Sequence, residues 1–405
     1  MVGDGDGETN ADRDTDADLR ADTTWRDPAP FRIEAQGQSL TFYPGGAERL
    51  DALCDLIAQA QTSFRAFYYT FRQDAAGRKV RDALVCAARR GVAVTLFVDG
   101  FGSDVGDAFC EPLTRAGGRF AVFQAKFSRR YLIRNHQKLA IADGTRAMIG
   151  GFNIEQSYFE PPGDEGWHDL GLVIEGSAVD LLDDWFDRLD DWVARPSAQY
   201  RDIRRKVRGW GEQSGPVQLL IGGPTRGLSS WAKAIQDDLA QGTRLDMVMA
   251  YFSPPAKVLR RIGGIAKGGE ARLVMAAKSD NGATIAAARS LYHYLLERGT
   301  EIYEFTPTKL HMKIVVLDDA VYLGSANFDM RSLYVNLELM LRIEDAGLAD
   351  RMRAFIADHH SVSRRITLAE HDARATLFTK VRRNLAWFLV SVVDYNVARR
   401  LNLGL

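Results

Sequence analysis

Two stretches of the sequence, "HQKLAIADGTRAMIGGFN" at residues 136–153 and "HMKIVVLDDAVYLGSAN" at residues 311–327, decide the fold because they are two copies of one pattern. Each begins with His-x-Lys-x4-Asp and ends with a glycine and an asparagine, in a run of apolar residues that indicates a β-strand. Two such matches in one chain of this length would rarely arise by chance. The sequence therefore predicts an internal duplication.

The segments that precede the two copies repeat as well. In the first half, the strand-like residues 63–71 are followed by an amphipathic helical stretch, an Arg-Gly turn and a β-rich segment within 77–100. In the second half, residues 244–252 and 256–281 show the same order. Strands that alternate with helices indicate a layered α/β architecture. We therefore expect an α/β fold built from two homologous repeats.

The ends and the middle of the chain differ in composition from the two repeats. Residues 1–27 hold nine acidic residues against three arginines, which is typical of a disordered tail, and the rest of the chain carries a net charge of about +5. The region 196–215 is charged, contains Gly and Pro and lacks clear periodicity. These features predict a tail at 1–29, repeats at 30–196 and 215–365, a linker at 197–214 and a helical C-terminal segment at 366–405.

The C-terminal segment and the cysteines bear on where the protein acts. The longest apolar run, 385–393, is about half the ~18–20 residues that span a bilayer, and no signal peptide is recognisable. Basic pairs flank this run, so 382–403 is either a helix packed on the body or an amphipathic segment on anionic lipid. Three cysteines are too few for a disulfide framework or a metal site. We expect a cytoplasmic protein bound peripherally to the inner face of the cell membrane.

The duplicated motif carries side chains suited to phosphate chemistry. On a strand, residues i and i+2 share a face, so each histidine projects beside the lysine that follows it. The lysines and asparagine amides would stabilise negative charge on a phosphate diester, without a metal or cofactor. One histidine would attack phosphorus, and the other would act as acid and then as base. The predicted catalytic residues are His136, Lys138, His311 and Lys313, and the predicted phosphate-binding residues are Asn153, Ser325 and Asn327.

Asp143 and Asp318 complete the two motifs and are grouped with the catalytic residues. Their odd offset from the histidines would point them to the opposite face of a regular strand. We therefore expect them to act structurally, by closing the turns that end the strands.

Two further carboxylates occupy equivalent places in the repeat, Asp169 in "DLGLVIE" and Glu338 in "ELMLRIE". A carboxylate that accepts a ring N–H fixes the tautomer of a histidine and raises the basicity of the other nitrogen. The repeat predicts that Asp169 orients His136 and that Glu338 orients His311.

The duplicated motif resembles the hallmark of the phospholipase D superfamily, a duplicated His-x-Lys-x4-Asp followed by Gly-Ser-x-Asn, over nearly all of residues 30–365. "GSANFDMRSLYVNLE" at 324–338, "GGFNI" at 150–154 and "VDGFGS" at 98–103 are similar to bacterial cardiolipin synthases. Gly151 departs from the serine of the pattern. No counterpart of the paired N-terminal transmembrane helices of many such synthases is expected, as in a shorter subgroup of them.

This resemblance implies two α/β sandwich repeats packed about a pseudo-two-fold axis, with one shared active site. It also implies that His136 is the nucleophile and His311 the acid and base. The implied reaction makes cardiolipin from two phosphatidylglycerol molecules, through a phosphohistidine, and releases glycerol. Anionic phospholipid is then the partner. Nucleic acid is not, because a dense Lys/Arg stripe with interleaved aromatic residues is missing.

Three other functions use the same residues. A phospholipase D would transfer the phosphatidyl group to water and release phosphatidic acid. A phosphodiesterase or nuclease would bind a different diester in the same place, and a scaffold would bind lipid without turnover. The catalytic residues are common to all of these, so the motif leaves the acceptor alcohol open.

Overall fold

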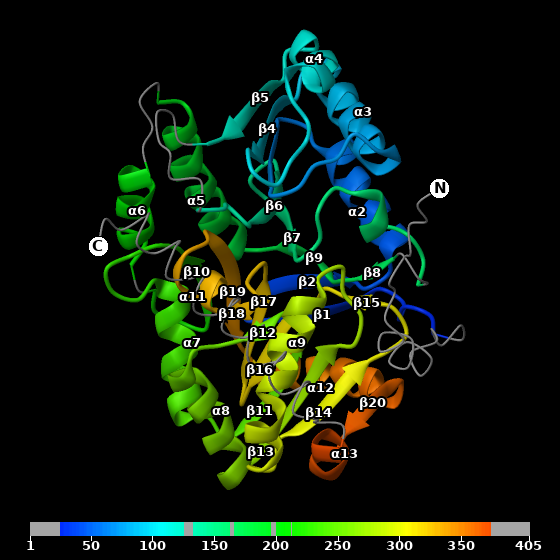
Figure 1. The fold of residues 1–405 in the computed structure, drawn as a ribbon. Helices are drawn as coiled ribbons and strands as arrows, with labels where there is room; N and C mark the ends of the chain where they lie inside the picture. The colour runs from blue at the N-terminus through cyan, green and yellow to red at the C-terminus, as the bar shows by residue number, and fades with distance from the viewer. Residues whose placement is uncertain (1–24, 125–132, 163–165, 196–199, 212, 374–405) are drawn as a thin grey trace, which may run out of the picture.

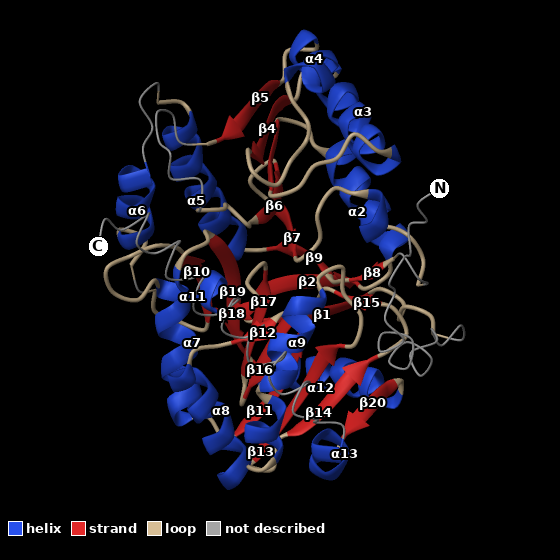
Figure 2. Cartoon of the chain, viewed as in Figure 1, coloured by secondary structure: helices blue, strands red, loops and turns tan. Residues whose placement is uncertain are grey.

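The computed structural model describes residues 25–124, 133–162, 166–195, 200–211 and 213–373. Two large mixed sheets dominate the molecule, one from each half of the chain, and helices lie outside and between them (Figures 1 and 2). The predicted α/β class and the predicted pair of homologous repeats are confirmed.

The first sheet has eight strands, and residues between 31 and 175 form all of them. In spatial order these are β1 (Phe31–Ala35), β2 (Gln38–Tyr43), β9 (Gly171–Glu175), β7 (Arg146–Gly150), β6 (Lys138–Ala142), β3 (Ser63–Tyr68), β4 (Ala93–Asp99) and β5 (Arg119–Phe123). The helices of this half are α2 (Gly46–Gln59), α3 (Ala75–Arg89), α4 (Asp107–Arg115), η1 (Gln156–Tyr158), α5 (Ala178–Val193) and α6 (Tyr200–Arg208).

The second sheet repeats this order, starting from the strand equivalent to β2. In spatial order it contains β10 (Val217–Gly222), β19 (Glu338–Glu344), β17 (Ala320–Gly324), β16 (Lys313–Leu317), β11 (Arg244–Met249), β13 (Glu270–Ala276), β14 (Glu301–Phe305) and β20 (Ser363–Ile366). Its helices are α7 (Ser230–Gln241), α8 (Ala256–Gly268), α9 (Gly282–Ser290), α10 (Tyr292–Leu296), α11 (Met330–Tyr334), α12 (Ala346–Ser361) and α13 (Leu368–Ala373).

Three hydrophobic clusters explain this layering. One joins α2, α3 and α4 to the outer face of the first sheet, and another joins α7, α8 and α10 to the outer face of the second. The third contains α5 and α12 together with inward-facing residues of both sheets. Burial of apolar area on both faces of a sheet requires such covering layers. The two halves therefore share one core, with α5 and α12 between the sheets.

The two motif strands lie in the middle of their sheets, and their lysine ends point to the same junction. Lys138 pairs with Tyr68 of β3, and Lys313 pairs with Met249 of β11. At this junction the halves are joined by parallel pairing of β8 (Trp167–His168) with β15 (Lys309–Leu310), which lie side by side in Figure 1. A second short pair, β12 (Phe252–Ser253) with β18 (Phe328–Asp329), stays within the second half.

The boundary predicted for the acidic tail is too far along the chain. The indole ring of Trp25 lies 5.6 Å from the ring of His168 and 5.5 Å from that of Phe305, and Asp27 Oδ1 lies 2.7 Å from His168 Nδ1. A tryptophan buries a large apolar area, which outweighs the acidic composition around it. Residues 25–29 therefore belong to the described fold, and residues 1–24 lie outside it.

The segment predicted to be an irregular linker contains helix α6. Ile203 and Val207 are four residues apart and almost fully buried, so they form an apolar stripe on an otherwise charged helix. Of the predicted C-terminal segment, the structure describes only residues up to 373, so the apolar run at 385–393 lies outside it. Among the described residues, no helix combines the length and hydrophobicity that crossing a membrane requires.

Candidate active site

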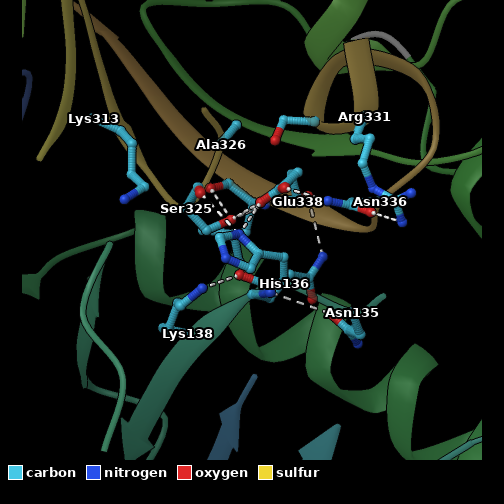
Figure 3. Close-up of polar contacts among 12 residues, drawn as sticks. Asn135, His136, Lys138, Lys313, Ser325, Ala326, Arg331, Asn336 and Glu338 are labelled. Carbon is cyan, nitrogen blue, oxygen red and sulfur yellow. Dashed lines mark hydrogen bonds and ion pairs between the residues drawn. The ribbon is translucent and has the colours of Figure 1, made fainter. Parts of the chain in front are cut away.

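His136 stands at the junction of the two halves and is oriented by a carboxylate from the other half. Its Nδ1–H donates to Glu338 Oε2 at 3.1 Å, and Ser325 donates its hydroxyl to the same oxygen at 2.6 Å (Figure 3). The backbone N–H of His136 donates to Leu337 O at 2.8 Å, which holds this segment against the start of β19.

His311 is held in the equivalent way from the opposite side. Its Nδ1–H donates to Asp169 Oδ2 at 2.6 Å, and its backbone N–H donates to His168 O at 2.8 Å. The pairing predicted from the repeat, Asp169 with His136 and Glu338 with His311, is therefore wrong. Each histidine is oriented by the carboxylate of the other half. The cause is the packing of the halves, in which the segment before each motif strand pairs with the segment that leads into β9 or β19 of the other half.

The two lysines bring positive charge to this junction. Lys138 Nζ donates to His136 O at 2.7 Å, and Lys313 Nζ bonds to His311 O. Both side chains are buried, yet within the described residues neither ammonium group has a carboxylate within ion-pair distance. They lie on the same side of His136 in Figure 3. A buried cation without such a partner is costly, so the site has a strong preference for an anion.

Burial and the lysine charges govern the protonation of the histidines. Burial, reinforced by Lys138, lowers the pKa of His136 to about 4, although Glu338 opposes the shift. Burial and Lys313 lower the pKa of His311 to about 3, against the opposing effect of Asp169. At neutral pH both rings are therefore neutral, and the Nδ1–H bond to a carboxylate leaves the lone pair on Nε2.

Burial and mutual attraction also shift the pKa values of the other charged groups of the site. Burial raises the pKa of Asp169, but the attraction of His311 and Lys313 is stronger and the net shift is downward. Burial lowers the pKa of Lys313 to about 8 and that of Lys138 well below its usual value. A bound diester anion would reverse much of the lysine shifts, because it supplies the missing negative partner.

The two halves satisfy the same backbone N–H in different ways. In the second half, Leu339 N–H donates to the Ser325 hydroxyl at 3.0 Å. In the first half, Leu170 N–H donates to Asp169 Oδ1 at 2.7 Å, and a Cβ added at Gly151 would lie 2.7 Å from that same oxygen. The shorter Asp169 therefore occupies the space of a serine side chain. This explains why glycine stands at 151, the departure noted from the sequence.

The predicted phosphate-binding asparagines lie buried at the same edge. Asn153 Oδ1 accepts from Thr70 N at 3.2 Å, and its amide donates to the Tyr158 hydroxyl at 3.0 Å. Asn327 is buried, and its side-chain oxygen has no hydrogen-bond partner in the described chain. Ser325 is used instead to hold Glu338. The predicted role of Ser325 in binding phosphate is thus not what its contacts show.

The motif aspartates follow the ends of β6 and β16 and bind backbone N–H groups there, in line with the predicted structural role. Asp143 caps the segment before β3 by accepting from the backbone N–H groups of Gln61, Thr62 and Ser63 at 2.7–3.1 Å. Asp318 accepts from Thr243 and Arg244 in the same manner. Five residues of strand, about 16 Å, separate each from its lysine, so neither is a catalytic residue.

Sequence reasoning missed the tyrosines of the site, and for Trp167 it left lining the entrance and packing in the interior as equal alternatives. The Tyr158 hydroxyl lies 3.4 Å from His311 Nε2, and the Trp167 ring lies 5.3 Å from the His311 ring. On the other side the Tyr69 ring lies 4.8 Å from the His136 ring. Tyr69 belongs to the run "FYYTF", whose strand pattern predicts packing and gives no sign of a place at the site.

His168, the neighbour of Asp169, is buried and faces away from the site. Its Nε2 lies 2.8 Å from His359 Nε2 in the interior. Across the described residues, no group of three or more His, Cys, Asp or Glu side chains has an arrangement that could hold a metal ion.

The comparisons with known proteins agree with this geometry. A family model described as "Cardiolipin synthase, PLD-like domain" matches residues 53–190 and 236–359, well over half of the chain. The chain belongs to this family. The predicted membership of the phospholipase D superfamily is confirmed.

Curated relatives carry names of the same kind. The chain is 31% identical over 333 residues to "Cardiolipin synthase 2" of Bacillus anthracis, which covers 77% of this chain and 62% of that protein. It is 26% identical to the "Major cardiolipin synthase ClsA" of Bacillus subtilis, over 89% of this chain and 77% of that one. The chain thus spans somewhat under two thirds of the length of the first of these relatives.

Solved structures show the same fold at low sequence identity. Phosphatidylserine synthase of Haemophilus influenzae superposes with a TM-score of 0.70 at 16% identity, covering 96% of this chain and all of that one. Polyphosphate kinase of Porphyromonas gingivalis gives a TM-score of 0.52 at 14% identity, over 80% of this chain and 50% of that one. These likenesses concern the architecture of the two repeats.

Proposed function

We propose that the chain is a phosphatidyltransferase that makes cardiolipin from two phosphatidylglycerol molecules and releases glycerol. The observation that carries this proposal is the crossed pair of histidines, each with a carboxylate on Nδ1, beside two buried lysines that lack a carboxylate partner. In the proposed complex, a diester anion binds between the lysines and faces both Nε2 atoms. The relatives are named as cardiolipin synthases, and this indicates the lipid class.

In the first half-reaction, His136 Nε2 attacks phosphorus and the bond to the glycerol oxygen breaks. His311 donates its Nε2 proton to that oxygen, so glycerol leaves neutral. For this step His311 must be protonated in the complex. The diester supplies the means, because its negative charge offsets the Lys313 charge that lowers the pKa of His311.

In the second half-reaction, a hydroxyl of the second phosphatidylglycerol attacks the phosphohistidine. His311 Nε2 takes the hydroxyl proton, the phosphorus–nitrogen bond breaks and His136 is regenerated. His311 ends the cycle with the proton it lost in the first step. Two displacements at one phosphorus give net retention of configuration.

Two observations, the exposure of the two histidines and the neighbours of their Nε2 atoms, favour His136 as the nucleophile. The His136 side chain is 13% exposed and that of His311 only 4%. The Tyr158 hydroxyl, which accepts from Asn153, lies within reach of the His311 lone pair. In the described chain His136 Nε2 has no such neighbour, so its lone pair is available for attack.

Incubation of the full chain with phosphatidylglycerol vesicles tests the proposal, with His136→Asn as the control. We expect cardiolipin and glycerol in equal amounts from the wild type and neither from the variant. Phosphatidic acid without cardiolipin would assign the chain to the hydrolases, and no turnover of any diester would contradict an enzymatic role.

A further inference from the structure

Large apolar side chains that are exposed are rare in the described chain, and they lie on loops beside the site. Phe101 is 56% exposed and Leu228 is 46% exposed. Phe101 follows β4, and Leu228 follows β10, whose last residue, Gly222, pairs with Glu338. Both loops thus leave their sheets at the edge where the catalytic residues stand.

The loop of Phe101 is tied directly to the His136 segment. Asp99 accepts from Phe101 N–H at 2.8 Å with one carboxylate oxygen, and from Asn135 N–H at 2.8 Å with the other. The Arg134 guanidinium stacks 4.3 Å above the Phe101 ring. The Phe101 loop is therefore held by Asn135 and Arg134, the residues one and two positions before His136.

The loop of Leu228 stands on the same flank of the site. Arg134 O accepts from Leu337 N–H at 2.9 Å, and the next residue, Glu338, is the one paired with the end of β10. Arg226 is exposed in the same loop as Leu228. Helix α5 contacts both β5, the neighbour of β4, and β10, so it links the two sheets on this flank.

We propose that Phe101 and Leu228, together with Arg134 and Arg226, form the surface that docks this flank of the site onto an anionic bilayer. The proposal rests on the proposed function, since a site that acts on phospholipid must open toward the membrane. Apolar side chains flanked by arginines suit the interface, where the former enter the acyl region and the latter meet lipid phosphates.

The apolar and the basic side chains are expected to contribute to membrane binding in different ways. Phe101 and Leu228 gain from burial in any bilayer, because the hydrophobic effect does not depend on lipid charge. Arg226 gains only where the surface is negative, and this contribution weakens with salt. Binding should therefore combine a salt-resistant part with a salt-sensitive part.

Flotation of the full chain with phosphatidylglycerol-rich vesicles tests the surface. Phe101→Ser with Leu228→Ser is expected to weaken the partition coefficient by about ten-fold or more, with an unchanged thermal midpoint because both side chains are exposed. Wild-type binding in the double variant would overturn the proposal and place the membrane contact elsewhere in the chain.

A charge-matched pair of variants sharpens the test. Arg226→Gln is expected to lower binding to anionic vesicles about five-fold, and to leave binding to phosphatidylcholine vesicles unchanged. Lys267→Gln removes one exposed charge at the end of α8 remote from the site, and should have no effect on either. Equal losses for the two variants would show that only net charge matters, which contradicts a defined surface.

This experiment separates the surface from the proposed reaction. Vesicle binding through these residues without cardiolipin synthesis would refute the reaction and keep the surface. Cardiolipin synthesis in detergent micelles, together with vesicle binding that neither set of variants changes, would support the reaction and refute the surface.

Discussion

The two halves of the active site solve one problem with different residues. Around His136, the long Glu338 needs the Ser325 hydroxyl to hold its carboxylate and to satisfy Leu339 N–H. Around His311, the shorter Asp169 performs both tasks alone. The comparison teaches that two positions in each half must match each other, 151 with 169 and 325 with 338, because together they hold the carboxylate and bind one backbone N–H. A serine in place of Gly151 is not a harmless return to the pattern.

The largest expected effect tests whether the halves also differ in chemistry. His136→Asn should abolish transfer, by about 10⁴-fold or more, because no phosphohistidine forms. His311→Asn should abolish lipid transfer but still form the phosphoenzyme with a diester whose leaving group needs no proton, such as a p-nitrophenyl ester. Intact mass under alkaline conditions would detect the covalent species. Its appearance in His136→Asn would reverse the two roles.

The next effect tests the Gly151–Asp169 pair. Gly151→Ser should lower transfer by about 10²-fold, because its Cβ would displace the Asp169 carboxylate from His311. Adding Asp169→Glu should recover much of the loss, since the pair then matches that of the other half. Gly264→Ser is the matched control, because a Cβ there meets nothing within 4 Å. Steady-state rates of the four combinations measure the coupling, and purely additive losses would sink the idea.

A smaller effect concerns the neutral histidines. The pKa of His136 is lowered to about 4 by burial, while that of an unfolded histidine is about 6.5. Between these values the unfolded chain binds more protons than the folded one. The free energy of unfolding should therefore fall as the pH falls, by up to ~1.4 kcal/mol per pH unit. Urea titrations from pH 7 to 4.5 should show a shallower slope in His136→Asn than in the wild type.

The smallest effect separates the motif aspartates from the site. Asp143→Ala should lower the free energy of unfolding by about 1–2 kcal/mol, since several backbone N–H groups lose their acceptor, and should leave the turnover rate within about two-fold. Asp318→Ala should behave alike. Chemical denaturation with a parallel rate measurement checks both. A loss of turnover without a loss of stability would return these residues to the catalytic set.

The sequence was sufficient for the repeat, the strand faces and the side chains that gather at the site. Period-two alternation predicts that His136 lies beside Lys138 and that Asp143 points away. Lys138 Nζ does reach the backbone oxygen of His136, and Asp143 accepts from Thr62 N–H, although His136 and Asp143 lie just outside β6. It was not sufficient for the pairing of histidines with carboxylates. That pairing depends on how one half packs on the other. Two repeats with the same pattern look alike in sequence whether each carboxylate bonds to the histidine of its own half or to that of the other half.

Other differences have local causes. Trp25 docks against His168, a contact with a residue far along the chain that the composition of an acidic segment does not reveal. Helix α6 had a visible signal, the pair Ile203 and Val207, but its stripe is only two residues wide. Tyr158 reaches His311 from the 3-10 helix η1, which is too short for periodicity to predict where its side chains point.

The crossed pairing has a consequence for how such a molecule could arise. Each half of the chain supplies the carboxylate that orients the histidine of the other half. An ancestor with a single repeat would therefore have had complete sites only as a dimer, in which each subunit oriented the histidine of its partner. Joining two copies in one gene fixed the stoichiometry and removed the dependence on concentration. It also allowed each copy to accumulate substitutions separately. The glycine in one half and the serine in the other are a difference that a pair of identical subunits could never encode.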